Sequence, residues 1–526
     1  VSVDGGTIKL DGNYPVGTKN VGLGDDALSA VQSGAENNIA IGASALAAVT
    51  TSNDNTAVGN FALAATTGSQ NTGVGQQALR FNTSGQYNTA QGYRALFSNT
   101  TASNNTAVGY QAGYSNQTGQ ENVFIGRVAG YFTTNSYNVA VGDAALYNNT
   151  SGGTNTAIGK SALQSNTTAS NNTAVGYQAG YSNTTGSIQA FGRRALYSNT
   201  TGVNNTATGF NALNANTTAG SNTANGSYSL YLNTTGASNT AIGHSALENN
   251  TTASNNTAVG WSAGYSNSTG VRNTFLGETA GYRATSNKNT FVGQESGFFV
   301  TAGGSNTILG RYNGNQGGLD IRNSSNNIVL SDGDGNPRGF YNNAVNGWVL
   351  GDGDASTYWP NTSSVNNHNG VMIFPITGAL GVTTNQSTAL YLNRNSTSSP
   401  DGNVANFYRN GVFKGSISVS SSSTAYNTSS DYRLKENVVE LTGATDRLKQ
   451  LNPSRFNFIA DADTIVDGFL AHEVQSVVPE AITGTKDAVD ADGNPEYQGI
   501  DQSKLVPLLV ATIQELEARI TALEAN

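Results

Sequence analysis

Asn105-Thr106-Ala107-Val108-Gly109-Tyr110-Gln111-Ala112-Gly113 is one copy of a motif that recurs from about residue 20 to residue 310. Each copy reads Asn, then Thr, Val or Ile, then Ala, a variable residue, Gly, two variable residues, Ala, and finally Leu or Gly. Successive copies are 16 to 18 residues apart, and a period sustained over so long a stretch indicates one structural unit copied many times. The central glycines are residues 24, 42, 59, 75, 92, 109, 126, 142, 159, 176, 192, 209, 226, 243, 260, 277, 293 and 310.

Each repeat predicts one coil of β-structure. A repeat is too short for a pair of helices, and Gly, Asn and Thr are too frequent in it for a helix. Thr106 and Val108 alternate with small residues, which is the period of a strand, and the second half of the repeat has the composition of a turn. The fold class we predict is mostly β, with residues 20–310 forming a parallel β-roll or β-solenoid shaft after an N-terminal segment, residues 1–19.

The repeats resemble the head repeats of trimeric autotransporter adhesins and repeats found in phage fibres. That resemblance implies a trimer of left-handed β-rolls. Burial favours the same arrangement, because one coil of this composition buries little apolar area and three chains side by side would bury more. We therefore expect a homotrimer.

The net charge of the chain lies in its last hundred residues. Charged residues make up 11% of the 526 residues, against about 25% in ordinary globular proteins. Residues 431–526 contain 8 Lys or Arg and 17 Asp or Glu, which accounts for the whole formal net charge of -9. The sequence has no basic patch for nucleic acid, no cysteine for disulfides or thiolate metal sites, and no apolar run long enough to span a bilayer. We expect neither nucleic-acid binding nor membrane insertion.

Residues 311–429 lose the repeat but keep alternating segments, and we predict a β-rich knob or a distal shaft there. Aromatic side chains become frequent in this region. They could stack on the sugars of a receptor or pack in a core, and core packing is the more common role. The candidate receptor-binding residues are Tyr341, Trp348, Tyr358, Trp359 and His368.

Asp332-Gly333-Asp334-Gly335-Asn336 imitates the start of a calcium-binding loop. The twelfth position of such a loop is a glutamate, whereas Asn343 stands there in this sequence. We therefore favour a tight turn, and we expect no metal and no other cofactor.

A second motif, Ser430-Asp431-Tyr432-Arg433-Leu434-Lys435-Glu436-Asn437, begins where the charged region begins. It resembles the signature of the C-terminal intramolecular chaperone domains of phage tailspikes and tail fibres, best known from endosialidase tailspikes. The resemblance implies a small α+β chaperone domain over residues 430–526. Further matches follow in order at residues 451–453, 456–458, 468–475, 479–480, 497–501 and 505–509.

The resemblance implies that this domain holds three chains in register while the shaft folds and then cuts itself off near Ser430. Ser430 would be the nucleophile and Lys435 the base of a Ser-Lys dyad. A packed interior or the adjacent Arg433 would keep the lysine neutral. The residue types do not show which of the two peptide bonds beside Ser430 is cleaved. An alternative also stays open, in which Ser430 and Lys435 belong to a surface linker and the domain only holds a trimer together.

Four further residues are supporting candidates in this reading. Asp431 and Asn437 would set the geometry of the dyad. His472 and Glu473 match the second motif of the family, and they could polarise the scissile carbonyl, orient Lys435 or have a structural role.

Helical patterns appear only in this last domain. We predict helices over residues 442–451 and 472–478, each stopped by a proline, and a final helix capped by Asp501 or Ser503 with Pro507 in its first turn. Apolar residues recur in the final helix at steps of four and three, which predicts a short coiled-coil seam of about two and a half heptads. The seam residues are Leu509, Ile513, Leu516, Ile520 and Leu523.

Together with the repeats, the resemblance to tailspike chaperone domains implies a structural and receptor-binding tail fibre of a bacteriophage, with one self-cleavage as its only chemistry. Its partners would be two copies of itself, a glycan or protein receptor on the host cell surface and, through the N-terminus, other tail proteins of the virion. The fibre would be made in the host cytoplasm and act outside the cell as part of the virion tail.

Two other functions are possible. A tailspike that degrades host polysaccharide needs paired carboxylates in a groove, and a bacterial trimeric adhesin is expected to end in a membrane anchor. We rank the adhesin low, because the sequence ends in a helical seam. The acids of the shaft, on which a depolymerase would depend, are few and scattered: Asp143, Glu248, Glu278 and Glu295.

Overall fold

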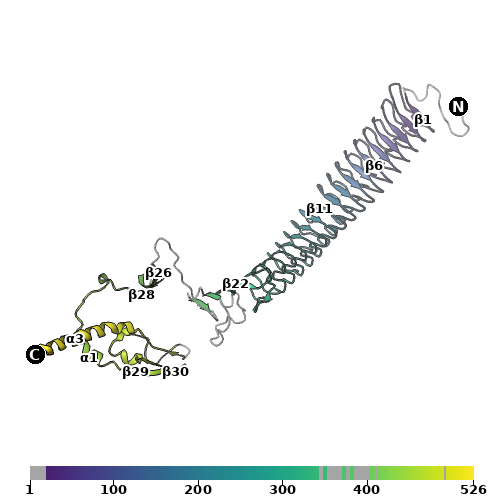
Figure 1. Cartoon of the computed structure of the whole chain (residues 1–526). Helices are drawn as coiled ribbons and strands as arrows, with labels where there is room; N and C mark the ends of the chain where they lie inside the picture. The colour runs from purple at the N-terminus through teal and green to yellow at the C-terminus, as the bar shows by residue number, and fades with distance from the viewer. Residues whose placement is uncertain are drawn as a thin grey trace. The chain divides into compact units, whose positions relative to one another are not determined.

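The computed structural model describes residues 19–342, 347–351, 370–374, 379–383, 402–409, 412–420, 422–490 and 493–525. The chain forms two compact units, Val1–Tyr391 and Leu392–Asn526. The first unit is a long solenoid followed by antiparallel strands, and the second combines small sheets with the helices (Figure 1).

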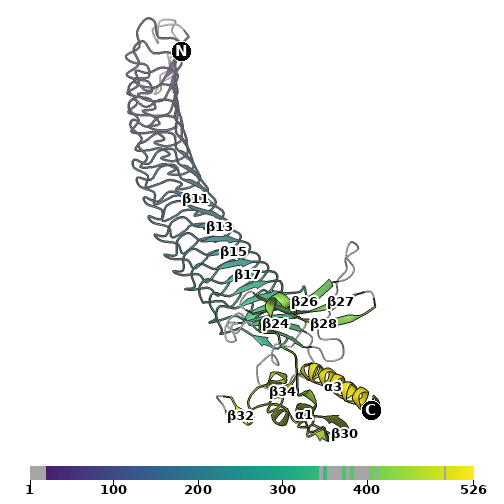
Figure 2. The ribbon, with the colours of Figure 1, turned by 90° about the vertical axis from the view of Figure 1, so that its left-hand side faces the viewer.

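The solenoid stacks one short strand per coil along its axis, as Figure 2 shows. Every neighbouring pair from β1 to β18 is parallel, and the register sets equivalent residues of successive repeats side by side, as with Ala107 and Phe124. The predicted mostly β solenoid with repeats of about 17 residues is therefore confirmed. Its strands are β1 (Val21–Leu23), β2 (Ile39–Ile41), β3 (Thr56–Val58), β4 (Thr72–Val74), β5 (Thr89–Gln91), β6 (Thr106–Val108), β7 (Val123–Ile125), β8 (Val139–Val141), β9 (Thr156–Ile158), β10 (Thr173–Val175), β11 (Ile188–Phe191), β12 (Asn205–Thr208), β13 (Thr223–Asn225), β14 (Thr240–Ile242), β15 (Thr257–Val259), β16 (Thr274–Leu276), β17 (Thr290–Val292) and β18 (Thr307–Leu309).

The core of most coils is built from the middle residue of the strand and from two adjacent turn residues, such as Ala95 and Leu96. The middle residue of most strands is a fully buried alanine such as Ala107, and a fully buried leucine such as Leu96 lies in the turn. The strand residues on either side of the alanine, Thr106 and Val108 in β6, face away from the core. The small central side chain lets the walls of the coil approach and pack at high density.

Two columns of buried asparagines bond successive coils to one another. The backbone N–H and Nδ2 of Asn122 both donate to Asn105 Oδ1, at 3.0 and 3.1 Å. In the second column, Asn116 Nδ2 donates to the Gly119 carbonyl at 2.8 Å and to Asn99 Oδ1 at 3.4 Å. A buried amide without partners would be costly, so these bonds hold each coil in register with the next.

The backbone explains the glycine of the motif. Gly109 has a φ of 137°, which side chains rarely allow. A Cβ at this position would also collide with the carbonyl of Gly126 in the next coil. The stacking distance between coils therefore excludes any side chain at the motif glycine.

Large residues in the core are matched by glycines in the turns. Strand β7 carries Phe124 where most strands have alanine, and the turns beside it have Gly113 and Gly130 where most turns have leucine. A Cβ on either glycine would clash with the Phe124 ring. Core volume is thus kept nearly constant from coil to coil. The same exchange pairs Phe275 with Gly264 and Gly281, and Phe291 with Gly297.

We expect Gly130→Leu to destabilise the shaft. Leu146 adopts a φ of 54°, so leucine is tolerated in this conformation, and the cost arises from overpacking against Phe124, about 1 to 3 kcal/mol. Thermal unfolding followed by circular dichroism should show a lower midpoint. Adding Phe124→Ala and Gly113→Leu restores the usual alanine and leucine pattern and should recover most of the loss. An unchanged midpoint in the single variant would contradict this packing account.

Antiparallel strands continue the sheet after the last repeat. β21 pairs in parallel with β18, and β21 to β25 then pair antiparallel in sequence order. Tyr312 closes the end of the core, where it is fully buried and donates its hydroxyl to the Leu319 carbonyl at 2.6 Å. Burial raises the pKa of Tyr312. The strands that continue the sheet are β21 (Ile328–Ser331), β22 (Pro337–Asn342), β23 (Gly347–Gly351), β24 (Gly370–Phe374) and β25 (Ala379–Thr383). Strands β19 (Asn315–Gln316) and β20 (Leu319–Asp320) form a separate antiparallel pair.

The second unit holds a three-stranded antiparallel sheet, three two-stranded ladders and the helices, with α1 packed on α3. A small core of apolar side chains, including Val474, Val478 and Leu508, joins the helical elements. The elements are β26 (Gly402–Arg409), β27 (Val412–Val419), β28 (Thr424–Thr428), η2 (Tyr432–Leu434), α1 (Ala444–Leu448), β29 (Ser454–Phe458), β30 (Asp461–Gly468), α2 (Ala471–Val474), η3 (Pro479–Ala481), β31 (Ile482–Thr483), β32 (Ala488–Val489), β33 (Pro495–Glu496), β34 (Gly499–Ile500), η4 (Gln502–Leu505) and α3 (Val506–Glu524).

The predicted helices all exist, but two are shorter than expected. Residues 442–451 contain only the five-residue α1, and residues 472–478 overlap the four-residue α2. The final helix α3 has Pro507 in its first turn, and Asp501 caps the preceding η4. None of the helices that the structure describes combines the length and the hydrophobicity needed to cross a bilayer.

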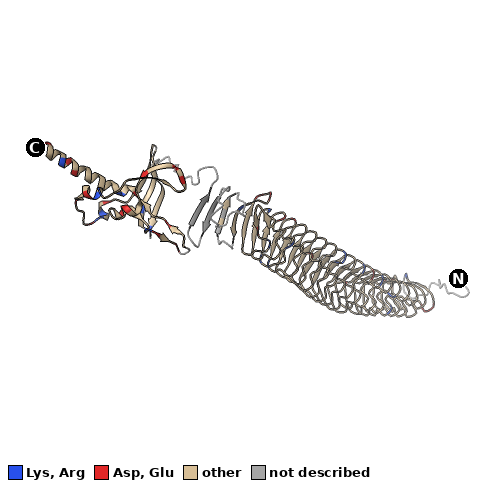
Figure 3. Cartoon of the chain, turned by 90° about the horizontal axis from the view of Figure 1, so that it is seen from below, with Lys and Arg blue, Asp and Glu red and all other residues tan. Residues whose placement is uncertain are grey.

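The region predicted as a knob, residues 311–429, divides between the two units. Strands β21 to β25 extend the sheet of the solenoid, whereas β26 to β28 form a separate sheet in the second unit. In Figure 3, few positions along the solenoid ribbon have the colours of charged residues, whereas many do in the second unit, in agreement with the charge distribution of the sequence.

Candidate functional site

The site forms where the chain leaves strand β28. Asp431 caps the 3-10 turn η2, because its Oδ1 accepts the backbone N–H of Arg433 at 2.9 Å. The Arg433 guanidinium also donates to both oxygens of this carboxylate, at 2.9 and 2.6 Å. The side-chain hydrogen bonds from Arg433, with its backbone bond second, lower the pKa of Asp431. The carboxylate thus stays charged and holds the turn closed.

The turn brings the two candidate catalytic residues together. Lys435 Nζ donates to Ser430 Oγ at 2.8 Å, although the residues are five apart in sequence. The Lys435 backbone N–H closes the turn by donating to the Tyr432 carbonyl at 3.1 Å. A hydroxyl within hydrogen-bond reach of an amine is the geometry that proton transfer from a serine nucleophile needs.

One chain does not provide the packed interior that we expected around Lys435. Residues 422–443 are all exposed in the described chain, the dyad included. Arg433 is not a free cation beside the lysine either, because Asp431 neutralises it. The dyad is therefore positioned in the single chain but remains open to water.

Of the other supporting candidates, Asn437 follows the dyad closely in sequence, whereas His472 and Glu473 lie on α2. Asn437 takes a left-handed φ of 54°, which turns the chain just after Lys435 and which asparagine tolerates better than most residues. Glu473, on α2, accepts a hydrogen bond from Asn452 Nδ2 at 3.3 Å, a contact that fits a structural role. The structure does not pair His472 or Glu473 with Ser430 or Lys435 in the residues that it describes.

A partly buried set of hydrogen bonds that we did not predict, called the Glu515 clamp below, fixes the start of α1. The Glu515 carboxylate accepts the backbone N–H groups of Ala444 and Thr445, at 2.7 and 2.8 Å, and the Thr445 hydroxyl at 2.6 Å. These bonds, led by the Thr445 side chain, lower the pKa of Glu515 to about 2. The sequence signal was weak, because a glutamate beside a coiled-coil seam usually faces solvent.

Glu515→Gln should remove a pH-dependent part of the stability of this domain. The folded pKa of about 2 lies below the usual value, so the charged carboxylate stabilises the fold above about pH 4.5. That contribution is lost as the pH falls from about 4.5 towards 2. We expect denaturant unfolding of the helical signal to become less pH-dependent over this window in the variant. A variant whose pH profile matches that of the native chain would contradict the clamp.

Residues 430–483 match the family described as chaperone of endosialidase. The match begins at Ser430 and runs through α1 and α2 to β31, so it includes the dyad, His472 and Glu473. Residues 430–526, of which only residues 430–483 carry this match, are called the chaperone domain below. The comparisons with curated proteins and with solved structures gave no match.

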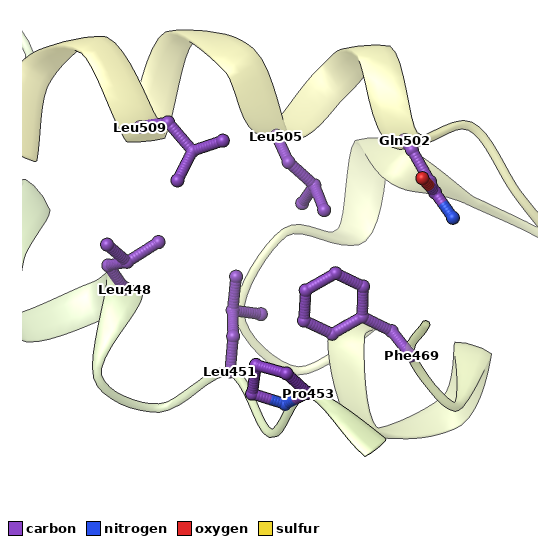
Figure 4. A pocket seen from close by; sticks show the side chains of 7 residues that line it. All are labelled: Leu448, Leu451, Pro453, Phe469, Gln502, Leu505 and Leu509. Carbon is purple, nitrogen blue, oxygen red and sulfur yellow. The ribbon is translucent and has the colours of Figure 1, made fainter. Parts of the chain in front are cut away.

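The chaperone domain contains an apolar pocket of about 340 Å³ (Figure 4). Helix α3 and η4 form one wall. The end of α1, the chain just after it and the residue after β30 form the other, with the side chains of the two walls pointing toward one another. All but one of the lining residues are apolar: Leu448, Leu451, Pro453, Phe469, Gln502, Leu505 and Leu509.

Two of the candidate receptor-binding aromatics pack against each other. Tyr341 and Trp348 face each other across β22 and β23, with ring centroids 5.8 Å apart. This contact fits the packing role that we weighed against sugar binding. Tyr358, Trp359 and His368 lie outside the described residues.

Two of the four shaft acids named above are paired with basic side chains. Asp143 is paired with Arg127 at 2.8 Å and with Lys160 at 3.6 Å. Glu295 is paired with Arg311 at 2.9 Å. Carboxylates neutralised in this way are poorly suited to act as the acid and base of glycoside hydrolysis.

The calcium-like sequence forms the tight turn that we predicted. Asp332 Oδ1 accepts the backbone N–H groups of Asp334 and Asn336, at 3.0 and 2.8 Å, and Arg338 binds Oδ2 at 2.7 Å. The backbone bond from Asn336, followed by the Arg338 side chain, lowers the pKa of Asp332 to about 2. The carboxylate is thus already engaged by donors from its own turn.

Proposed function

We propose that this chain is a homotrimeric tail fibre of a bacteriophage whose C-terminal chaperone domain directs assembly and then cuts itself off at Ser430. The observation that carries the proposal is the 2.8 Å contact of Lys435 Nζ with Ser430 Oγ, at the first residue of the family match. The site lies between a repetitive solenoid and the chaperone domain, where a cut would separate the two.

The solenoid creates the need for such a domain. Its coils are nearly identical, so three chains shifted by one coil would bury almost as much surface as three chains in register. Aligning long parallel repeats is also slow, since the entropy of bringing them together is lost before the contacts form. A detachable clamp at one end fixes the register before the coils pack.

The outer face of the sheet supports association of the shafts. The third residue of many strands is apolar and points outward, and Ile125, Ile158 and Ile242 each expose about 40% of their surface. In a single chain this stripe is in contact with water along most of the solenoid. Burying it between chains would supply the hydrophobic free energy that one coil lacks.

The proposed cleavage needs only groups of this chain. Lys435, in its neutral form, takes the proton of Ser430 Oγ as the oxygen attacks the carbonyl of a flanking peptide bond. An ester forms, the C–N bond breaks, and the lysine returns the proton to the leaving amine. Water then hydrolyses the ester, which leaves a carboxylate on one fragment and the serine hydroxyl restored.

The remaining parts of the proposal follow from the fibre role. The N-terminus would join other tail proteins of the virion, and the fibre would contact a glycan or protein on the host surface. Such a fibre is assembled in the host cytoplasm and acts outside the cell. The engaged carboxylates of the shaft give no specific support to a depolymerase.

Intact mass spectrometry before and after assembly tests this function. The uncut chain has a mass of 54.3 kDa. We expect freshly made chain to show this mass and assembled protein to show two masses that sum to it plus one water, with the break beside Ser430. Assembled trimers that retain the full mass would contradict the self-cleaving role.

A further inference from the structure

The chaperone domain exposes an apolar segment beside the dyad. Residues 430–443 are all exposed in the described chain. Four apolar side chains among them, Tyr432, Leu434, Val438 and Val439, expose between 73% and 84% of their surface. Single exposed apolar residues are common, but this density in so short a segment is typical of a surface that another molecule covers.

The same domain offers a cavity of matching character. The pocket beside α3 measures about 340 Å³ and is lined almost wholly by apolar side chains. It can hold several aliphatic side chains. One of its lining residues, Leu509, also belongs to the predicted coiled-coil seam, so in a trimer the neighbouring chain would run close to the pocket.

We propose that the apolar segment 432–441 of one chain docks into this pocket of a second copy. The inference rests on the proposed trimer and adds how the chains engage at the cleavage site. The docked segment carries Lys435, so that docking would shield the dyad from water.

The fixed start of α1 favours a neighbouring chain over the segment's own pocket. Leu448 of α1 is itself part of the pocket wall, and segment 432–441 leads into this helix. To enter its own pocket the segment would have to reverse direction near Gly443. Glu515 already holds the following two residues through three hydrogen bonds, which fixes the path of the chain there.

Docking would couple the cut to assembly. Burial disfavours the protonated form of a lysine amine, and the neutral amine is the form that can accept the Ser430 proton. A lone chain holds its dyad in the right geometry but leaves it open to water. Cleavage would follow only after two chains have met.

Disulfide trapping tests the docking without background, because the chain has no cysteine. Two differently tagged full-length chains, both with Ser430→Ala to prevent cutting, are co-expressed and oxidised. One carries Val439→Cys and the other carries Gln502→Cys at the pocket. On a non-reducing gel we expect a covalent dimer that contains both tagged chains, and this dimer should disappear on reduction. The matched control replaces Gln502→Cys with Lys486→Cys, an exposed position outside the pocket, and should give no such product.

The outcomes separate this inference from the proposed function. Assembled trimers without the mixed product would overturn the docking, and so would an intrachain disulfide in a chain carrying both cysteines. As a second measurement, Val438→Asn with Val439→Asn in the Ser430 chain should slow cleavage per assembled chain by about ten-fold or more. Cleavage at the unaltered rate would also overturn it. If the proposed function itself is wrong, the native chain stays uncut. If only the docking is wrong, the native chain is still cut.

Discussion

Ser430→Ala is expected to yield a fibre that assembles normally but retains its chaperone domain. Removing the nucleophile of a comparable hydrolytic unit costs on the order of 10^6 in rate, so no cut should be detectable. The domain keeps its fold, because Ser430 is exposed and its hydroxyl is bonded only to Lys435 among the contacts described. A denaturing gel should show one band at 54.3 kDa for the variant and two fragments for the native chain.

Two further variants make this result specific. Lys435→Met removes the base and should slow the cut by about 10^2 to 10^4. Ser429→Ala removes the adjacent hydroxyl, which is also exposed, and should be cut at the native rate. The same fragment appearing from Ser430→Ala would exclude the dyad and favour a plain linker at this position.

The solenoid could be predicted from sequence because the same few physical requirements recur in most coils. Gly109 and its equivalents must lack a side chain, Asn105 must bond the coil above, and Ala107 must be small. Because each coil imposes the same requirements, the same residue types recur in the sequence at a fixed period. The volume exchange between Phe124 and its neighbouring glycines is visible in the same repeats, but it becomes interpretable only when the ring is seen against Gly113 and Gly130.

The structure of the chaperone domain was harder to predict from sequence, because its key contacts join residues that are far apart along the chain. Glu515 lies 70 residues after Thr445, so no local sequence pattern predicts their hydrogen bonds. Helix α1 is shorter than its apolar pattern suggests, since Gly443 in a left-handed conformation precedes it. The dyad was predicted as a pair from a resemblance, but its closing turn depends on the Asp431–Arg433 contact, which required the structure.

Deleting residues 431–526 is expected to prevent assembly of the shaft. Most coils place two or three non-glycine residues in a left-handed backbone, for example Arg94, Leu96 and Asn104 at φ of 54°, 50° and 61°. This conformation costs about 1 to 2 kcal/mol per residue, so an isolated coil is unfavourable and the first aligned set of coils must be held in place. Without the chaperone domain, registers shifted by one coil compete with the correct one, and exposed strands aggregate.

The most direct test compares the truncated chain with the Ser430→Ala chain by size-exclusion chromatography with light scattering. The two differ in whether the chaperone domain is present, while neither can cut itself after assembly. Our account predicts a soluble trimer of defined mass for Ser430→Ala and aggregates or mixed stoichiometries for the truncated chain. A truncated chain that forms soluble trimers, with the same thermal midpoint as the mature fibre, would contradict the central role of the chaperone domain.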